Sequence, residues 1–181
     1  YFFVIIFIVL NIYGIKKIDS LNGLSIGYVF IITIVTLLIS PDSFKNKFSL
    51  IISDKQILFF LITTFFLTIF SMLDKIRVGE SGLYLLGTIA PIFIILLYKH
   101  TINISPLFII LMFWYPLFEL IFSIIKKIYF KFNYNLNKTD YFHELLKFFL
   151  KKRFKTSEFS AKNFTIIIIN VINLLTIYIG S

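Results

Sequence analysis

The chain has 181 residues, of which 59% are hydrophobic, 19% aromatic and 15% charged. Soluble domains carry about 25% charged residues, so this composition excludes a soluble protein and predicts an integral membrane protein. The sequence has no cysteine and only two histidines, His100 and His143, which excludes a disulfide framework, a cysteine nucleophile and a multi-histidine zinc site. Its net charge of +9 is typical of basic cytoplasmic loops, so we expect a bilayer and no nucleic acid as partner.

Six apolar segments approach the length that crosses about 30 Å of hydrocarbon. In chain order they cover residues 2–13, 26–40, 57–72, 83–98, 106–125 and 164–179. Each is predicted to be a helix, because a lone strand cannot satisfy its backbone groups in lipid. The sequence begins inside an apolar run, with no basic n-region and no small-residue cleavage site. We therefore expect one all-α, polytopic membrane domain over residues 1–181, with a truncated first span, forming the C-terminal part of a longer protein.

The basic residues predict how the spans are oriented. The loops at 14–25, 73–82 and 126–163 hold fourteen lysines and arginines, whereas those at 41–56 and 99–105 hold four. The positive-inside rule places the first set in the cytoplasm. Within the cytoplasmic loop 126–163, "FHELLKFFLKKRF" (142–154) is predicted to be a basic, amphipathic helix at the membrane interface. Asp19, Glu80 and His143 consequently fall on the cytoplasmic side.

The stretch "IDSLNGLSIG", residues 18 to 27, places two polar side chains beside glycines. Asp19 and Asn22 are three residues apart, so on a helix they share a face. Gly23 and Gly27 allow another backbone to approach. The alternative is an N-cap, in which Asp19 or Ser20 caps the following span.

The stretch "KIRVGESGLYLLG", residues 75 to 87, puts the carboxylate of Glu80 between Gly79 and Gly82. A phosphate or Mg²⁺ can approach such a carboxylate closely. The alternative is an ordinary helix start, in which Ser81 is the cap and Glu80 lies at the positive end of the helix dipole.

Two further ionisable residues are candidates. Glu119, in "YPLFELIFSIIKKI", lies inside a predicted span, where a charge costs about 2.5–3.5 kcal/mol and is by default functional; the alternative is that it reaches the interface or a partner such as Lys127. His143, in "KTDYFHELLKFF", follows Asp140 by three residues on a predicted helix, and its alternative is a solvated histidine.

In this order and spacing, the four stretches resemble motifs of the polyprenyl-phosphate sugar-1-phosphate transferases. This bacterial family includes phospho-N-acetylmuramoyl-pentapeptide transferase and undecaprenyl-phosphate N-acetylglucosamine-1-phosphate transferase. "YGIKKIDSLNGLS" is similar to N-G-I-N-x-I-D-G-L-N-G-L-S, and "KIRVGESGLYLLG" to K-I-F-x-G-D-S-G-x-x-x-L-G. "YPLFELIFSIIKK" resembles P-x-x-[DE]-x-x-x-x-x-x-R-R, and "DYFHELL" resembles D-x-x-H-L-H-x-L-L. The likeness covers nearly the whole chain.

The resemblance implies roles for individual residues. Glu80 stands where the family has an aspartate that binds Mg²⁺, and Asp19 and Asn22 fall in the segment that lines the uridine nucleotide site. Glu80 and Asp19 are the implied catalytic residues. His143 falls in the histidine motif that contacts the sugar-nucleotide phosphates.

Charge and position add three cations to this set. Lys16 is a further candidate for the nucleotide site, and Lys75 and Arg77 are candidates for contacts with phosphate.

The sequence departs from the family pattern at several of these positions. Tyr13 and Lys16 replace two asparagines, Ser20 replaces a glycine, Glu80 replaces the aspartate, and Tyr141 occupies a neighbouring histidine position. The family's paired aspartates would precede Tyr1.

The resemblance implies an Mg²⁺-dependent transferase at the cytoplasmic face of a bacterial plasma membrane. Sugar-1-phosphate would move from a UDP-sugar to a polyprenyl phosphate with release of UMP, for synthesis of a cell-envelope polysaccharide. Two alternatives stay open: a homologue that has lost catalysis and acts as a membrane interaction subunit, and a transporter with Glu119 as an intramembrane relay. The sugar, the final polymer and a homo-oligomeric state are not fixed by the sequence.

Overall fold

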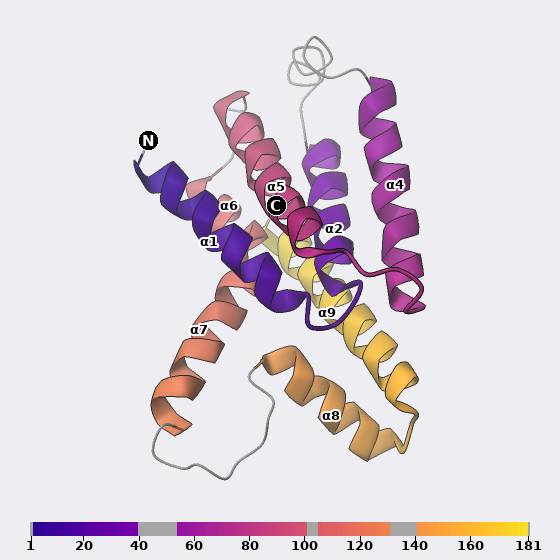
Figure 1. The fold of residues 1–181 in the computed structure, drawn as a ribbon. Helices are drawn as coiled ribbons and strands as arrows, with labels where there is room; N and C mark the ends of the chain where they lie inside the picture. Colours follow the sequence, from indigo (N-terminus) through magenta and orange to yellow (C-terminus); the bar gives the residue numbers. More distant parts are fainter. Residues whose placement is uncertain (1, 40–53, 101–104, 131–140, 181) are drawn as a thin grey trace.

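The structure is a computed structural model that describes residues 2–39, 54–100, 105–130 and 141–180, and within these ranges it contains helices and no strands. The prediction of an all-α chain is therefore confirmed. The helices are α1 (Phe2–Ile18), α2 (Leu24–Ile39), α4 (Asp54–Met72), α5 (Glu80–His100), α6 (Pro106–Met112), α7 (Trp114–Phe130), α8 (Phe142–Phe154) and α9 (Glu158–Gly180) (Figure 1).

Four of the six predicted apolar segments each fall within one helix, and the segment 26–40 coincides with α2 up to Ile39, since residue 40 lies outside the described residues. The prediction of one continuous helix over 106–125 is wrong, because α6 and α7 meet at a 64° bend. Pro116 explains the break: its ring lacks an N–H and collides with the carbonyl of the residue four positions earlier in a continuous helix. That residue is Met112, whose carbonyl oxygen instead accepts a hydrogen bond from the hydroxyl of Tyr28 at 2.6 Å. A partner from α2 thus satisfies the carbonyl that the break leaves free.

Some of the helices are long enough to span a membrane. Among the described residues, α4 and α9 are long and apolar enough to cross a membrane, and the bent pair of α6 and α7 is a third candidate if counted as one span. Large apolar side chains are exposed on outer helix faces, including Phe59, Leu107 and Tyr178, as expected for surfaces in contact with lipid. Membrane association is supported, while the count of six spans stays a prediction.

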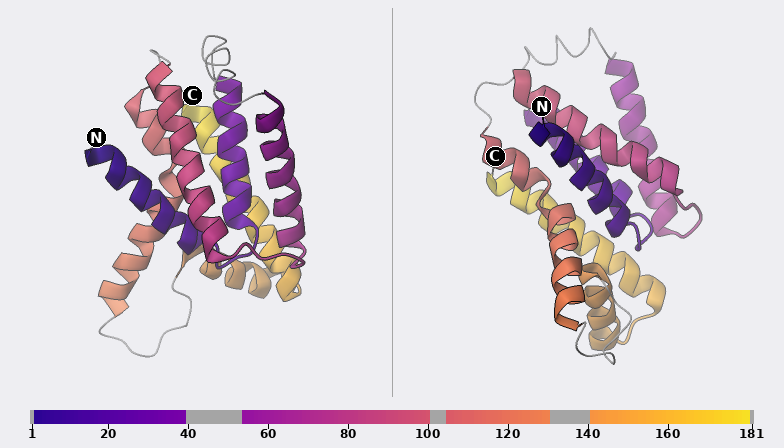
Figure 2. Two further views of the ribbon diagram at one scale, coloured as in Figure 1. Left: turned by 45° about the horizontal axis from the view of Figure 1, so that its top comes forward. Right: turned by 60° about the vertical axis from the view of Figure 1, so that its left-hand side comes forward.

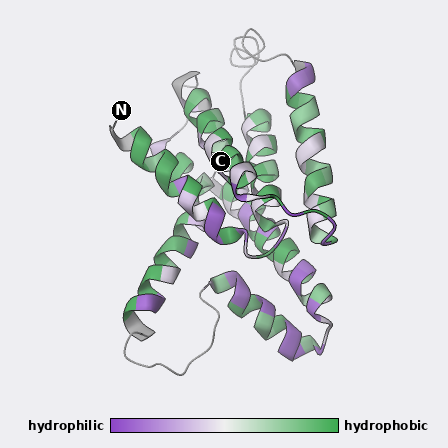
Figure 3. Cartoon of the chain, viewed as in Figure 1, coloured by the Kyte–Doolittle hydropathy of each residue, from purple (hydrophilic) through white to green (hydrophobic). Residues whose placement is uncertain are grey.

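The helices form a bundle with one polar end. The last residues of α1 and α4 and the first residues of α2, α5 and α9 lie at the same end, and α8 lies across it (Figures 1 and 2). Hydrophilic residues gather on α8, at the start of α9 and in the connections at this end (Figure 3). The helix predicted over 142–154 is present as α8 with the predicted bounds, and the motif-bearing stretches share one end of the molecule.

Two glycines let α1 pack closely against its neighbours. A Cβ atom added at Gly14 would lie 2.6 Å from the Cβ of Pro116 and 3.0 Å from its carbonyl oxygen, and one at Gly87 would lie 3.0 Å from the Cα of Ile12. Small residues allow this kind of close helix contact in membranes. The sequence around α1 therefore fixes its distance from both α5 and α7.

The substitution Gly14→Val should destabilise the fold, because its side chain would meet a rigid proline ring and a backbone carbonyl. Overpacking of this kind costs about 1–3 kcal/mol, and we expect a lower thermal unfolding midpoint in detergent. Gly79→Val is the matched control, since a Cβ there has no heavy atom within 4 Å. Equal midpoints for the two variants would contradict the close contact.

The absence of cysteine allows the sidedness of the bundle to be measured with single introduced thiols. We expect Ser20→Cys and Ser81→Cys to react with a membrane-impermeant maleimide from one side of the bilayer, and Ser105→Cys to react from the other. Labelling of Ser20→Cys and Ser81→Cys from opposite sides would show that the motifs do not share a membrane face.

Candidate functional site

Contacts between distant segments join the four motif-bearing stretches at the polar end of the bundle. Lys16, in the last turn of α1, forms an ion pair with Glu80 at the start of α5 at 3.1 Å. Ser20, in the connection between α1 and α2, is hydrogen-bonded to His143 of α8. His143 in turn contacts Glu119 of α7 at 2.8 Å. The structure thus brings together residues that lie more than a hundred positions apart.

Glu119 receives four hydrogen bonds. The hydroxyl of Tyr115 donates to Oε1 at 2.8 Å, and the backbone N–H groups of Phe142 and His143 donate at 3.0 and 3.1 Å. The fourth comes from the ring of His143, whose Nδ1 lies 2.8 Å from Oε1. Lys127 is not among these partners, so the alternative in which Glu119 pairs with that lysine is not realised.

The same contacts explain how α8 begins. The first N–H groups of a helix have no partner within the helix, and the N-cap residue Tyr141 makes no side-chain capping bond. Glu119 supplies the missing acceptor from α7, where its negative charge also suits the positive end of the helix dipole. The buried carboxylate therefore anchors α8 to α7.

His143 is fully buried, which excludes the alternative of a solvated histidine. The ring of Tyr141 stacks on the imidazole, with centroids 5.4 Å apart and planes at 9°. Lys17 Nζ donates to the hydroxyl of Tyr141 at 3.0 Å. The imidazole is thus held on one face by an aromatic ring and at each nitrogen by an oxygen from another helix or loop.

Asp19 and Asn22 do not share a helix face, because α1 ends at Ile18 and α2 begins at Leu24. Gly23 has a φ of +97° in this connection, a conformation that glycine adopts without strain. Asp19 accepts a hydrogen bond from the Ser25 hydroxyl at 2.5 Å. Burial raises the pKa of Asp19 to about 6, and the Ser25 bond opposes that rise.

Asn22 belongs to a second polar group, which the motifs did not reveal. Its amide donates to Asp74 Oδ1 at 2.9 Å, and Lys162 Nζ of α9 forms an ion pair with the same oxygen at 2.6 Å. Lys162 first and Asn22 second lower the pKa of Asp74. From the sequence, Lys162 is only one of fourteen lysines and arginines assigned to cytoplasmic loops. Its buried position depends on the packing of α9, which the local sequence does not indicate.

Glu80 is the first residue of α5, and its side chain is 71% exposed. Lys16 lies between two partners there, since its Nζ also donates to the Tyr84 hydroxyl at 3.2 Å. The bonds to Tyr84 and then Glu80 raise the pKa of Lys16. Lys75 and Arg77 are exposed in the connection that precedes Glu80, so all four charged groups face solvent at the polar end.

The metal prediction can be compared with the side chains present. Within the described part of the chain, no three histidine, aspartate or glutamate side chains are grouped so that they could hold a metal. Mg²⁺ commonly uses one or two carboxylates and completes its shell with water and substrate phosphates. An exposed Glu80 fits that mode of binding and does not fit an all-protein metal cage. Asp140, which precedes His143 in the motif, lies outside the described residues.

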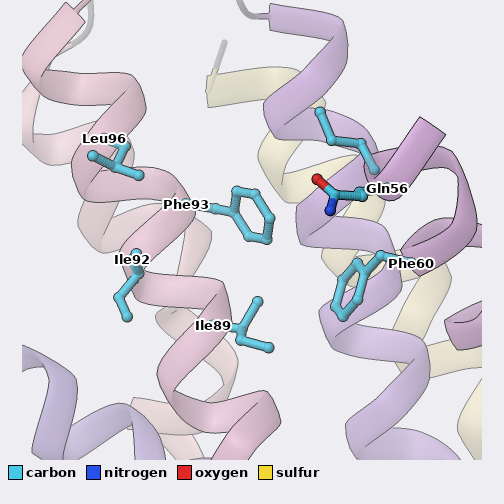
Figure 4. Close-up of a pocket in the computed structure, with 7 residues that line it drawn as sticks. Gln56, Phe60, Ile89, Ile92, Phe93 and Leu96 are labelled. Atoms are coloured by element: carbon cyan, nitrogen blue, oxygen red, sulfur yellow. The ribbon is translucent and has the colours of Figure 1, made fainter. Parts of the chain in front are cut away.

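A cavity of about 270 Å³ lies between α4 and α5, away from the polar end. Its walls are almost entirely apolar, with Phe60, Ile89 and Phe93 turned toward the space and Gln56 at its edge (Figure 4). A hydrocarbon chain suits this lining, whereas a nucleotide or a diphosphate does not.

A comparison with protein-family models, curated proteins and solved structures gives no match to this chain. The likeness to the sugar-1-phosphate transferases therefore stays a prediction that rests on the four stretches and on their spacing.

Replacing Asp19 or Asp74 by asparagine should shift the thermal unfolding midpoint in opposite directions. The folded pKa of Asp19 is about 6, above its ordinary value of 3.8, so the folded state takes up the proton first and gains stability as pH falls through that interval. We expect Asp19→Asn to unfold at a higher temperature than the wild type at about pH 8, with the difference vanishing near pH 4.

Asp74→Asn is the matched control, because the pKa of Asp74 is lowered and its charge stabilises the fold at neutral pH. This variant leaves the buried ammonium of Lys162 without its counter-ion, and it should unfold at a lower temperature than the wild type at about pH 8. The thermal midpoint of each variant across pH is the measurement, and a shift of the same sign for both would contradict the assignment.

Proposed function

We propose that the chain transfers sugar-1-phosphate from a UDP-sugar to a polyprenyl phosphate at the cytoplasmic membrane face, releasing UMP. One observation carries the proposal: Asp19, Glu80 and His143, which the resemblance assigns to nucleotide, metal and phosphates, lie at the same end of the bundle. Two contacts support that arrangement, the Lys16–Glu80 ion pair and the hydrogen bond between Ser20 and His143.

The charges at this end suit a reaction between two anions. Phosphoryl transfer depends mainly on positioning and on neutralising charge. Lys16 and Lys17 in the last turn of α1, with Lys75 and Arg77 before α5, place four positive charges at the polar end of the bundle. These cations attract both a diphosphate and an anionic lipid head group to the membrane surface, where the lipid acceptor resides.

Glu80 is the residue that would hold Mg²⁺, together with phosphate oxygens and water. When bound, the ion supplies Lewis-acid neutralisation of the pyrophosphate. The chain's own contribution is to fix Glu80 at the first turn of α5 and to hold Lys16 beside it at 3.1 Å. Asp19, which titrates at about pH 6, lies in the connection that follows α1.

The second candidate is a homologue without catalysis that serves as an interaction subunit. One observation favours it: Glu80 is paired with a lysine, and the described residues contain no cluster of three metal ligands. The transporter alternative relies on Glu119 as an intramembrane relay. This carboxylate instead accepts four hydrogen bonds and anchors α8, so the structure gives that alternative little support.

The substitution Glu80→Gln tests the proposal. In membranes that contain polyprenyl phosphate, we expect Mg²⁺-dependent release of UMP from a UDP-sugar to fall by roughly a hundredfold, the loss typical when a group that stabilises transition-state charge is removed. Glu158→Gln is the matched control, since Glu158 is exposed at the same end but pairs with Lys147.

Unchanged UMP release by Glu80→Gln would remove Glu80 from the mechanism. No release of UMP by the wild type with any UDP-sugar tested would favour the interaction subunit.

A further inference from the structure

We propose that Ser20, His143 and Glu119 form a nucleophile–base–positioning triad, and that Ser20 attacks phosphorus in a diphosphate bound at the polar end. This inference rests on the proposed function for its substrate and adds a covalent intermediate to it. The supporting geometry is a chain of two hydrogen bonds, from Ser20 Oγ to His143 Nε2 and from His143 Nδ1 to Glu119 Oε1.

The hydrogen bonds of Glu119 determine which nitrogen of the imidazole carries the proton. A carboxylate only accepts hydrogen bonds, so the proton of the neutral ring lies on Nδ1 and points at Glu119 Oε1, 2.8 Å away. Nε2 is then an acceptor, and its partner is the hydroxyl of Ser20. This is the arrangement by which a histidine withdraws a proton from a serine while a carboxylate fixes the ring.

Each member of the triad is held by different surroundings. Glu119 and His143 are fully buried, whereas Ser20 is exposed in the connection after α1. The ring of Tyr141 stacks on the imidazole, and Lys17 bonds the hydroxyl of that tyrosine at 3.0 Å. The base is thus rigid and shielded, and the nucleophile is exposed to solvent.

A phosphorus centre is the electrophile that fits this setting. Tyr115 donates to Glu119, and Tyr141, whose hydroxyl accepts from Lys17, stacks on the imidazole. Asp19 is the carboxylate next to Ser20 in the chain, and the cations in the last turn of α1 favour an anionic phosphate at this end. Lys16, one residue further back in α1, extends the positive charge toward Glu80.

The reaction balances in two steps. In the first, Ser20 Oγ bonds to the phosphorus that carries the sugar, the bridging P–O bond breaks, UMP leaves, and the hydroxyl proton passes to His143 Nε2. In the second, an oxygen of polyprenyl phosphate bonds to the same phosphorus, the P–Oγ bond breaks, and the proton returns from Nε2 to Ser20. Glu119 touches no reacting atom and acts as a positioning residue for the imidazole.

A single introduced thiol tests the triad without any substrate. A thiol paired with histidine forms thiolate at low pH, whereas an ordinary thiol has a pKa near 8.5. At pH 6 the thiolate fraction of the histidine-paired thiol is more than a hundredfold larger than that of an ordinary thiol. A thiolate of lower pKa is also a weaker nucleophile, which reduces this rate advantage by about tenfold. We therefore expect iodoacetamide to alkylate Ser20→Cys roughly tenfold faster than Ser157→Cys, which introduces a control thiol at another exposed serine of the polar end.

The faster alkylation of Ser20→Cys should disappear in the double variant that also carries His143→Gln. In the unaltered chain, ¹⁵N spectra of the two histidines should show one ring protonated on Nδ1, and Glu119→Gln should change that signal. An alkylation rate for Ser20→Cys that equals the control at pH 6, or a His143 ring protonated on Nε2, would overturn the triad even if a variant folded poorly.

The covalent step is tested by incubating the wild-type protein with a UDP-sugar in membranes that lack polyprenyl phosphate. We expect release of about one UMP per protein and a peptide that carries sugar phosphate on Ser20, which Ser20→Ala abolishes and Ser157→Ala retains. Continuous UMP release that requires polyprenyl phosphate, without an adduct, would overturn the role of Ser20 while supporting the proposed function. No UMP with or without the lipid would overturn the proposed function, and with it the diphosphate target.

Discussion

The buried carboxylate of Glu119 is the interaction on which the polar end depends. It accepts the first two backbone N–H groups of α8 and the imidazole of His143, and Tyr115 of its own helix supplies a further bond. Leaving a buried polar group without its hydrogen-bond partner costs about 1–3 kcal/mol, and more for a charged group, so α8 and the imidazole cannot leave α7 independently. The position of His143 relative to the α1–α2 connection is therefore set by a helix-capping interaction made between two helices.

That interaction requires α7 to diverge from α6. A continuous helix through Phe113 is blocked by Pro116, and the resulting 64° bend redirects α7 toward α8. Pro116 also packs against Gly14 of α1, where a side chain would not fit. Tyr28 satisfies the Met112 carbonyl that the break exposes. One proline thus connects three features: the bend, the close approach of α1, and the direction from which Glu119 reaches its partners.

The sequence predicted the helices well and their contacts poorly, for a physical reason. Hydrophobic length and the basic pattern of 142–154 are local signals, so the helix class and the bounds of α8 followed directly. The partners of Glu119, and the ion pair of Asp74 with buried Lys162, join helices far apart in sequence and leave no local trace. The connection at 19–23 lies within the predicted loop 14–25, so the helix face that Asp19 and Asn22 would share does not form; Gly23, with its positive φ, directly precedes α2. Pro116 alone does not predict the break over 106–125, because Pro91 lies inside the continuous helix α5.

Four of the five departures from the family motifs, all except Tyr13, contact His143 or one another. Ser20 stands where the motif has glycine and Tyr141 where it has a histidine, and both touch His143. Lys16 and Glu80, which replace an asparagine and an aspartate, form an ion pair with each other. These contacts place the four replacements at the polar end, where two of them surround a buried, fully hydrogen-bonded imidazole and the other two neutralise each other.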